Sequence, residues 1–459
     1  MADQYDVVIM GAGPGGYVAA ARMGGLGMKV ACVEKGHLGG CCLNVGCIPT
    51  KTLLHSSQVV SQVREGEDHG IRVEKLQVDL ARMIARKDNV VKKLRNGVGG
   101  LLKGKKVDVF EGTASLEDTQ NVIVKDSKGT ERTLSTKHIV IATGSVPVVP
   151  KIFPQDRSKV MTSDELLDLK ELPESLLIVG GGVIGCEFAT IFAELGTQVT
   201  IVEMVDRLLP MVDKDISKLL ARRFKELGIT VHVGNGVDKM VLGGKGVQTT
   251  LQGGESIDTT LALISTGRRP VSEGLGLEQV GVKTDDGGNI VVDDQCRTSV
   301  SNIFAIGDVT GKWQLAHVAY RQAAVVANVL SGQNDSEDYA VVPAAVYTHP
   351  EIAWVGLTED QAKEKGIKVR KAAMPMSASG MAMAYDVSIG TAKLLADENN
   401  EIVGAHLMMP HASDAIQEIA ALMKSECTLL ELEATIHGHP TFAESLSEVN
   451  AMLLGRGGH

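Results

Sequence analysis

A strand–turn–helix–strand unit that occurs twice constrains this chain of 459 residues more than any other feature. In the first copy an apolar run leads into a glycine-rich turn at residues 11–16, and a second apolar run ends at Glu34. In the second copy the turn occupies residues 180–185 and the closing run ends at Glu203. In both copies the acid lies 23 residues after the first glycine of the turn. The repeat predicts two α/β domains of the same kind in one chain.

The glycine spacing indicates what these domains bind. A G-x-G-x-x-G turn between a strand and a helix lets a pyrophosphate approach the helix N-terminus, and the acid is placed to accept from a ribose hydroxyl. Glu203 favours NAD over NADP, because a 2′-phosphate would lie against its carboxylate. The alternatives are that the turns are purely structural and that Glu203 is only a solvated strand end. The glycines concerned are Gly11, Gly13 and Gly16, and Gly180, Gly182 and Gly185.

A pair of cysteines, Cys42 and Cys47, precedes Pro49, a residue suited to the first turn of a helix. Cys47 is then expected at the helix N-terminus, where the helix dipole favours a thiolate. Because the chain can curl at Gly46, the two thiols can be bridged despite five residues of separation. No second Cys or His pair lies nearby to complete a tetrahedral zinc site. Two unrelated buried thiols are the remaining alternative.

A histidine-rich segment near the C-terminus contains a candidate general base. His439 is followed five residues later by Glu444, and His437 lies two residues before it. A histidine oriented by a carboxylate is a competent general base near neutral pH. The alternative is a structural histidine with its hydrogen bonds satisfied.

Charge and composition exclude several classes of protein. The formal net charge of −10 argues against general nucleic-acid binding, which needs a basic surface. No apolar run is long enough to span a bilayer, and the N-terminus carries no basic targeting segment. Seven cysteines in so long a chain are not a secreted disulfide framework. We therefore expect a cytoplasmic enzyme without a metal site.

The remaining chain is organised around these units. Residues 79–102 have the apolar spacing of a long helix, and prolines from Pro147 onward mark a linker. From about residue 342 the pattern changes to strands followed by helices over 414–424 and 444–454, which predicts a third, α+β domain.

These elements, in this order, resemble the pyridine-nucleotide disulfide oxidoreductases and, within that family, the dihydrolipoamide dehydrogenases. The resemblance covers essentially the whole chain. It implies an α/β fold with two Rossmann-like dinucleotide-binding domains plus a C-terminal α+β dimerisation domain. The implied boundaries are residues 1–146 and 271–342 for the FAD-binding domain, 147–270 for the NAD-binding domain and 343–459 for the interface. The segments that carry the resemblance are 39–51, 202–203, 266–270, 306–308, 314–317, 347–351 and 437–444.

The resemblance also implies the role of individual residues. Lys51 would lie beside the flavin ring and pair with Glu187. The other FAD contacts would come from the first glycine turn with Glu34, and from Gly112, Thr143, Gly144, Ser145, Asp308, Gln314, Leu315, Ala316 and His317. The NAD contacts would come from the second turn and from Glu187, Glu203, Val237 and Gly267.

The implied reaction is the oxidation of protein-bound dihydrolipoyl groups through a Cys42–Cys47 redox disulfide, with FAD and NAD as cofactors. His439 would act as the base, and Glu444 would orient it. The partners would be a second copy of the chain, sharing each active site, and a lipoyl-bearing acyltransferase or carrier protein of a 2-oxo acid dehydrogenase or glycine cleavage complex. Alternatives are a related disulfide reductase or diaphorase with another substrate, and a non-catalytic FAD-binding redox sensor.

The sequence departs from the family pattern at three places. Cys41 stands where the family usually has Thr, Thr50 stands where the family usually has Ser, and the segment 377–383 is less basic than usual. The acid at Glu203 argues against glutathione-type reductases, which have basic residues there. The C-terminus lacks the further cysteines of mercuric reductases.

Overall fold

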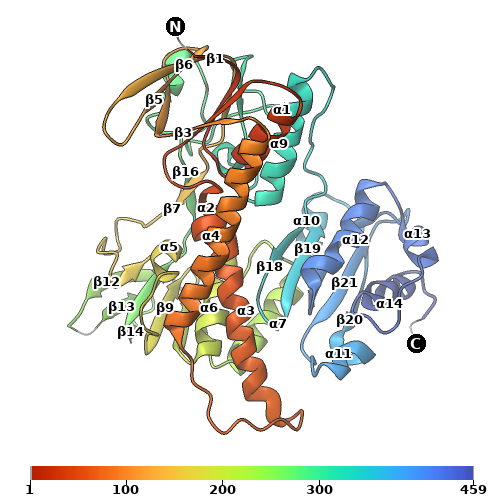
Figure 1. The fold of residues 1–459 in the computed structure, drawn as a ribbon. Helices are drawn as coiled ribbons and strands as arrows, with labels where there is room; N and C mark the ends of the chain where they lie inside the picture. The colour runs from red at the N-terminus through yellow and green to blue at the C-terminus, as the bar shows by residue number, and fades with distance from the viewer. Residues whose placement is uncertain (1–2, 245, 458–459) are drawn as a thin grey trace. The chain divides into compact units, whose positions relative to one another are not determined.

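The computed structural model describes residues 3–244 and 246–457, which fold into two compact units (Figure 1). The first unit comprises the residues up to 52 together with 81–148 and 267–338. The second comprises 53–80, 149–266 and the residues from 339 onward. The second unit thus includes most of the predicted NAD-binding and C-terminal domains, and the three predicted domain boundaries stay a prediction.

A seven-stranded sheet forms the centre of the first unit. Its parallel part places β1 (Asp3–Met10) between β2 (Val30–Glu34) and β6 (Glu131–Ile141). The stretches 7–10, 30–33 and 139–141 of these strands are apolar and buried. This is the pattern of a sheet covered on both faces. The remaining strands are β3 (Asp108–Glu111), β4 (Thr113–Leu116), β5 (Asn121–Lys125) and β17 (Ile303–Ala305). A short ladder joins β7 (Ser145–Pro147) to β16 (Arg268–Pro270).

Helices α1 (Pro14–Gly25) and α9 (Ala316–Leu330) pack against each other through small side chains such as Ala19 and Ala323 in one apolar core. Helix α2 (Gly40–Val45) precedes α3 (Cys47–Arg64), and α4 (Leu80–Gly104) is the predicted long helix. A short 3-10 turn, η2 (Gly307–Thr310), follows β17.

The second unit contains a five-stranded parallel sheet in the order β11-β10-β9-β15-β8. Here α6 (Val183–Leu195) connects β9 to β10, as α1 connects β1 to β2 in the first unit. The repeat predicted from the glycine turns is therefore present. The strands are β8 (Val160–Met161), β9 (Ser175–Val179), β10 (Gln198–Val202), β11 (Thr230–His232) and β15 (Leu261–Ile264). Helices α5 (Ser163–Leu166) and α7 (Lys214–Glu226) and the antiparallel strands β12 (Val237–Leu242), β13 (Val247–Leu251) and β14 (Ser256–Thr259) complete this part.

An antiparallel sheet in the order β18-β19-β22-β21-β20 forms the C-terminal part of the same unit, and α12 (Ala412–Lys424) and α14 (Glu444–Leu453) pack on it (Figure 1). The predicted α+β character is confirmed. The strands are β18 (Ala344–Val346), β19 (Glu351–Gly356), β20 (Arg370–Pro375), β21 (Thr391–Ala396) and β22 (Ile402–Met409). The short helices are α10 (Glu359–Glu364), α11 (Gly380–Ala384) and α13 (Leu429–Ala434).

Among the described residues, no helix combines the length and the apolar character that a membrane span requires.

Candidate active site of a disulfide oxidoreductase

The two predicted redox cysteines lie next to each other. Cys47 begins helix α3, as predicted, and the Cys42 and Cys47 thiols are hydrogen-bonded. A Cβ atom on Gly46 would lie 3.0 Å from the Cys41 carbonyl oxygen and 3.1 Å from the Cys42 Cα atom, so the close turn favours glycine. Both cysteines are thiols in this structure and both are partly exposed. The hydrogen bond with Cys47, together with burial, raises the pKa of the Cys42 thiol.

Cys41 belongs to a different network, which reasoning from the sequence missed. The Arg268 Nη2 atom lies 3.3 Å from the Cys41 Sγ atom, and Arg268 Nε donates to Ser145 Oγ at 2.7 Å. The Ser145 hydroxyl in turn donates to Asp308 Oδ2 at 2.5 Å. Two predicted FAD contacts, Ser145 and Asp308, are thereby brought together by an arginine that was not assigned a role.

The glycine turns fit a pyrophosphate. Gly11 and Gly180 have φ of +105° and +109°, and Cβ atoms at Gly16 and Gly185 would lie 1.9 and 2.0 Å from a turn carbonyl oxygen, so these glycines are required by the turn itself. Gly13 and Gly182 differ, because a Cβ atom at Gly182 meets nothing within 4 Å and one at Gly13 only reaches a Gly40 atom at 4.0 Å. Each of these two caps a helix without a side-chain hydrogen bond. The free space in front of helix N-termini is what a bound phosphate group needs.

The two strand-end acids have matching environments. Glu34 accepts from the backbone nitrogens of Ala12 at 2.7 Å and Gly36 at 2.8 Å. Glu203 accepts from Gly181 N at 2.6 Å and Val205 N at 2.9 Å. Each carboxylate is therefore fixed against its glycine turn, where the adenosine ribose of a dinucleotide is expected.

The other predicted FAD residues all lie in the first unit. Thr143 donates to the Val271 carbonyl oxygen at 2.6 Å, and the Gly144 carbonyl accepts from Val271 N at 2.9 Å. Gly112 donates to the carbonyl oxygen of Glu34 at 2.9 Å, close to the first turn. Leu315 caps α9, whose first residues are Ala316 and His317; Gln314 precedes the cap, and Lys51 lies in the first turns of α3.

The predicted NAD residues are divided between the units. Glu187 is buried in α6 and accepts from Tyr347 N at 3.1 Å, and Val237 begins β12. Gly267 belongs to the first unit. Lys51 and Glu187 belong to different units, and their pairing stays a prediction.

The C-terminal histidine and acid form the expected pair. His439 Nδ1 lies 2.7 Å from Glu444 Oε1, and Glu444 Oε2 accepts from Thr441 N at 2.6 Å. Burial opposes ionisation of Glu444, but the Thr441 and His439 hydrogen bonds outweigh it and lower the pKa of this carboxyl. The His439 ring is 83% exposed. Its second nitrogen is therefore accessible to a partner or substrate.

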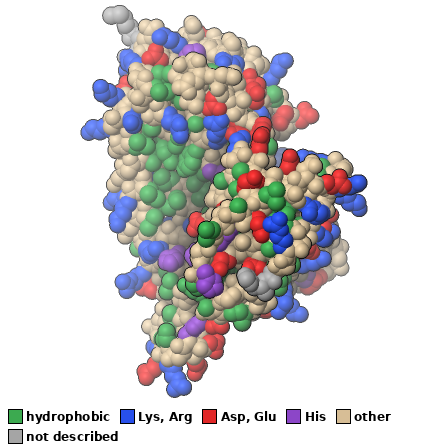
Figure 2. Space-filling view, turned by 90° about the vertical axis from the view of Figure 1, so that its right-hand side faces the viewer, with side chains coloured by type: hydrophobic (Ala, Val, Ile, Leu, Met, Phe, Trp, Pro, Cys, Tyr) green, Lys and Arg blue, Asp and Glu red, His purple; other side chains and the backbone are tan. Residues whose placement is uncertain are grey.

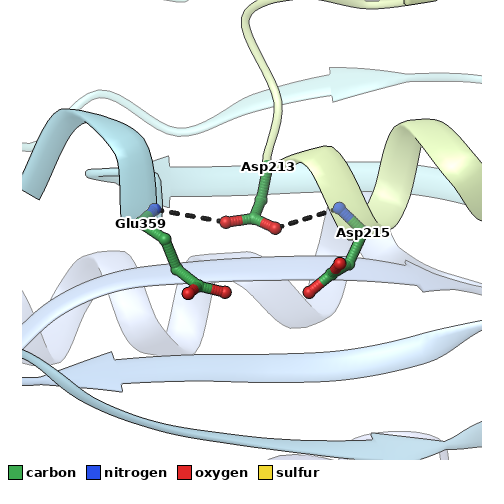
Figure 3. Close-up of side chains that lie close together, drawn as sticks. All are labelled: Asp213, Asp215 and Glu359. Carbon is green, nitrogen blue, oxygen red and sulfur yellow. Dashed lines mark hydrogen bonds between the residues drawn. The ribbon is translucent and has the colours of Figure 1, made fainter. Parts of the chain in front are cut away.

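An ion cluster around the buried Lys393 in the second unit was not predicted from the sequence. Three acids approach one another closely enough to hold a cation (Figure 3). The Lys393 ammonium forms an ion pair with each of them. The apolar run around Lys393 was the only signal in the sequence, because a lysine in a buried strand needs charged partners. The three acids are Asp213, Asp215 and Glu359.

Comparison with known proteins identifies the family. Residues 5–323 match the pyridine nucleotide-disulphide oxidoreductase model, and residues 342–450 match the dimerisation domain of the same family. The chain therefore belongs to the pyridine nucleotide-disulphide oxidoreductases. It is a flavoprotein disulfide oxidoreductase that uses FAD and NAD.

Individual proteins of this family are similar to the chain over almost its whole length. A dihydrolipoyl dehydrogenase from Chlamydia muridarum is 41% identical over 98% of this chain and 96% of its own length. Among solved structures, LpdA from Mycobacterium tuberculosis aligns with a TM-score of 0.92 at 27% identity, over 98% of this chain and 99% of its own. A Cu(II) complex of the HOCl-induced flavoprotein disulfide reductase RclA from Escherichia coli aligns with a TM-score of 0.89 at 31% identity, with the same coverage.

Proposed function

We propose that this protein oxidises dihydrolipoyl groups carried by a partner protein and reduces NAD⁺. The observation that carries the proposal is the Cys42–Cys47 thiol pair at the start of α3. The 41% identity to a dihydrolipoyl dehydrogenase supports this substrate over another disulfide.

Proton transfer and disulfide exchange are assigned to different residues of the chain. His439 Nε2 takes a proton from one substrate thiol, while Glu444 orients the ring and stabilises its charged form. The substrate thiolate attacks Cys42 Sγ in the oxidised enzyme, breaks the Cys42–Cys47 bond and releases Cys47 as a thiolate. The second substrate thiol then attacks the substrate sulfur of the mixed disulfide and breaks its bond to Cys42 Sγ; the Cys42 thiolate takes up the proton held by His439, which in turn accepts the proton of the second thiol. This step frees the oxidised lipoyl group and leaves both cysteines reduced. The dipole of α3 stabilises the Cys47 thiolate.

FAD supplies the transfer of the electron pair between the reduced cysteines and NAD. The residues proposed to hold FAD are the first glycine turn, Glu34, Ser145, Asp308 and the residues at the start of α9. The residues proposed to hold NAD are the second turn, Glu187 and Glu203.

We further infer an obligate homodimer in which His439 of one chain serves the cysteine pair of the other. The match of residues 342–450 to a dimerisation domain supports this arrangement. A lipoyl-bearing acyltransferase or carrier protein is the proposed protein substrate. A cytoplasmic location remains a prediction.

Steady-state reduction of NAD⁺ by dihydrolipoamide tests the proposal on the purified FAD-loaded enzyme. We expect turnover with the wild-type protein and none with Cys42→Ser or His439→Gln, whose folding is checked by bound flavin and thermal unfolding. Absence of turnover with dihydrolipoamide, alongside turnover of another disulfide, would assign a different substrate.

A further inference from the structure

Two tyrosine side chains of the first unit meet near the redox cysteines and have no role in the proposed mechanism. The hydroxyl groups of Tyr17 on α1 and Tyr320 on α9 are hydrogen-bonded at 3.2 Å. Their ring centroids are 6.3 Å apart in an edge-to-face arrangement. Such ring pairs are favourable beyond the area that they bury. The contact therefore fixes both rings where α1 and α9 pack against each other.

The helix that carries Cys42 packs against the start of α1. A Cβ atom on Gly40, the first residue of α2, would lie only 2.5 Å from the Gly13 Cα atom, so the two helices are in close contact there. Tyr17 follows one turn later on α1, and its backbone nitrogen donates to the Gly13 carbonyl oxygen at 2.9 Å. The tyrosine pair and the cysteines therefore lie in neighbouring turns of the same unit.

The electrostatics of Tyr320 agree with this placement. Burial and the Tyr17 hydrogen bond raise the pKa of the Tyr320 hydroxyl, and the nearby Cys42 and Cys47 thiols add to the rise. The phenol is therefore neutral at physiological pH. A neutral group beside the cysteines adds no charge that would oppose the approach of a substrate thiolate.

Tyr320 is also accessible. It is 37% exposed in a chain of which only 3% is aromatic. On the face of the molecule shown in Figure 2, apolar side chains gather in one region and charged side chains cover much of the rest, so exposed apolar groups are not spread evenly over this protein. An exposed ring near a reactive thiol pair is placed to contact an apolar substrate.

We propose that Tyr320 is a specificity-determining residue whose ring, fixed by Tyr17, contacts the aliphatic chain and the sulfur atoms of a dithiol that approaches Cys42. This inference rests on the proposed function and names the part of the substrate that is recognised. Methylene groups gain free energy when an apolar surface covers them, and sulfur atoms make favourable contacts with aromatic rings. A small polar dithiol lacks the aliphatic chain and gains less from the ring.

Single-turnover reduction of the bound flavin by dihydrolipoamide and by dithiothreitol tests the inference on the FAD-loaded enzyme. We expect Tyr320→Ala to lower the rate constant for dihydrolipoamide about 3- to 10-fold and that for dithiothreitol less than about 2-fold, because only dihydrolipoamide has an apolar chain. Tyr320→Phe is the matched control and should keep the wild-type ratio of the two rate constants, since the ring remains. Reduction of the flavin by NADH should be unchanged in both variants.

Three outcomes overturn the inference: unchanged rates in Tyr320→Ala, equal losses with both dithiols or with NADH, or a Tyr320→Phe enzyme that loses as much preference as Tyr320→Ala. Flavin content and thermal unfolding establish that each variant is folded, and Tyr320→Gln replaces an alanine variant that is not. The wild-type protein separates the two levels of the argument. If dihydrolipoamide does not reduce its flavin, the proposed function is wrong; if it does and one of the three outcomes is found, only the role of Tyr320 is wrong.

Discussion

Replacement of Lys393 by methionine removes one charge from a cluster of four and is expected to destabilise the second unit strongly. The Lys393 side chain is 1% exposed, and its ammonium donates to Asp213 at 2.8 Å, to Asp215 at 2.7 Å and to Glu359. Asp213 is equally buried and also accepts from the backbone nitrogens of Asp215 and Glu359, which fixes the starts of α7 and α10 (Figure 3). Methionine has a similar length but leaves the three carboxylates facing one another.

The size of the expected stability loss in Lys393→Met follows from the burial of the charges that lose their partner. Removing one partner of a buried ion pair costs about 3–5 kcal/mol, because the other charge is left without compensation. Asp215 is 45% exposed and regains water, so Asp213 and Glu359 account for most of the loss. Burial alone would raise the pKa of Asp213, but the Lys393 hydrogen bond and the backbone donors lower it below its usual value. In the wild type this stabilisation is present at neutral pH and is lost as the pH falls through the lowered pKa.

The stability of the Lys393→Met variant should depend on pH in the opposite sense to that of the wild type. Without the ammonium, the clustered carboxylates bind protons more tightly in the folded protein than in the unfolded chain. The stability deficit should therefore shrink between pH 8 and pH 5. The free energy of unfolding is measured by urea denaturation in a Trp313→Phe background. The signal is the fluorescence of Trp354, which is buried in β19.

Lys371→Met is the matched control, because Lys371 bonds the same Glu359 at 2.7 Å but is 56% exposed. An exposed pair is worth about 1 kcal/mol or less. Equal losses in Lys393→Met and Lys371→Met, or a Lys393→Met deficit that does not change with pH, would refute the reasoning.

Three further predictions concern the redox site. Cys41→Ser should retain most of the turnover with dihydrolipoamide, whereas Cys42→Ser should have none; a dead Cys41→Ser enzyme would show that the cysteine pairing is wrong. The kcat/KM ratio should favour NAD over NADP at least tenfold, because the Glu203 carboxylate repels a 2′-phosphate; comparable efficiencies would contradict this role for Glu203. Refolding His439→Gln together with Cys42→Ser should restore part of the activity, since one site of the hybrid dimer is intact; inactive hybrids of verified composition would exclude a shared site.

The sequence was most informative where local geometry dictates residue type. The glycine turns were predicted because a positive φ at Gly11 and the close approach at Gly16 exclude other residues. Helix α3 was predicted to begin near Cys47 because Pro49 suits only a first turn. The His439–Glu444 pair was predicted because both partners lie within one short segment.

Long-range partners could not be predicted in this way. Arg268 meets Cys41, which lies 227 residues away in the sequence, and Lys393 meets Asp213 across 180 residues. No local spacing encodes such contacts; they depend on which loops the topology brings to one place. Strand β20 was also missed, because alternate residues of Arg370–Pro375 are exposed at the edge of the sheet and the segment lacks a continuous apolar run.

The position of His439 is an argument for a site completed by a second chain. A general base acts within hydrogen-bonding distance of the proton it removes, and active sites commonly exclude water from that region. In the isolated chain the His439 ring is 83% exposed, although its partner Glu444 and its neighbour His437 are well fixed. Ile436, three residues earlier, is 96% exposed, and Tyr385 and Met383 of the same unit are more than half exposed. Such apolar exposure beside a prepared but uncovered base is typical of a surface that a partner buries. Since residues 342–450 match a dimerisation domain, we expect a second copy of this chain to supply the covering surface.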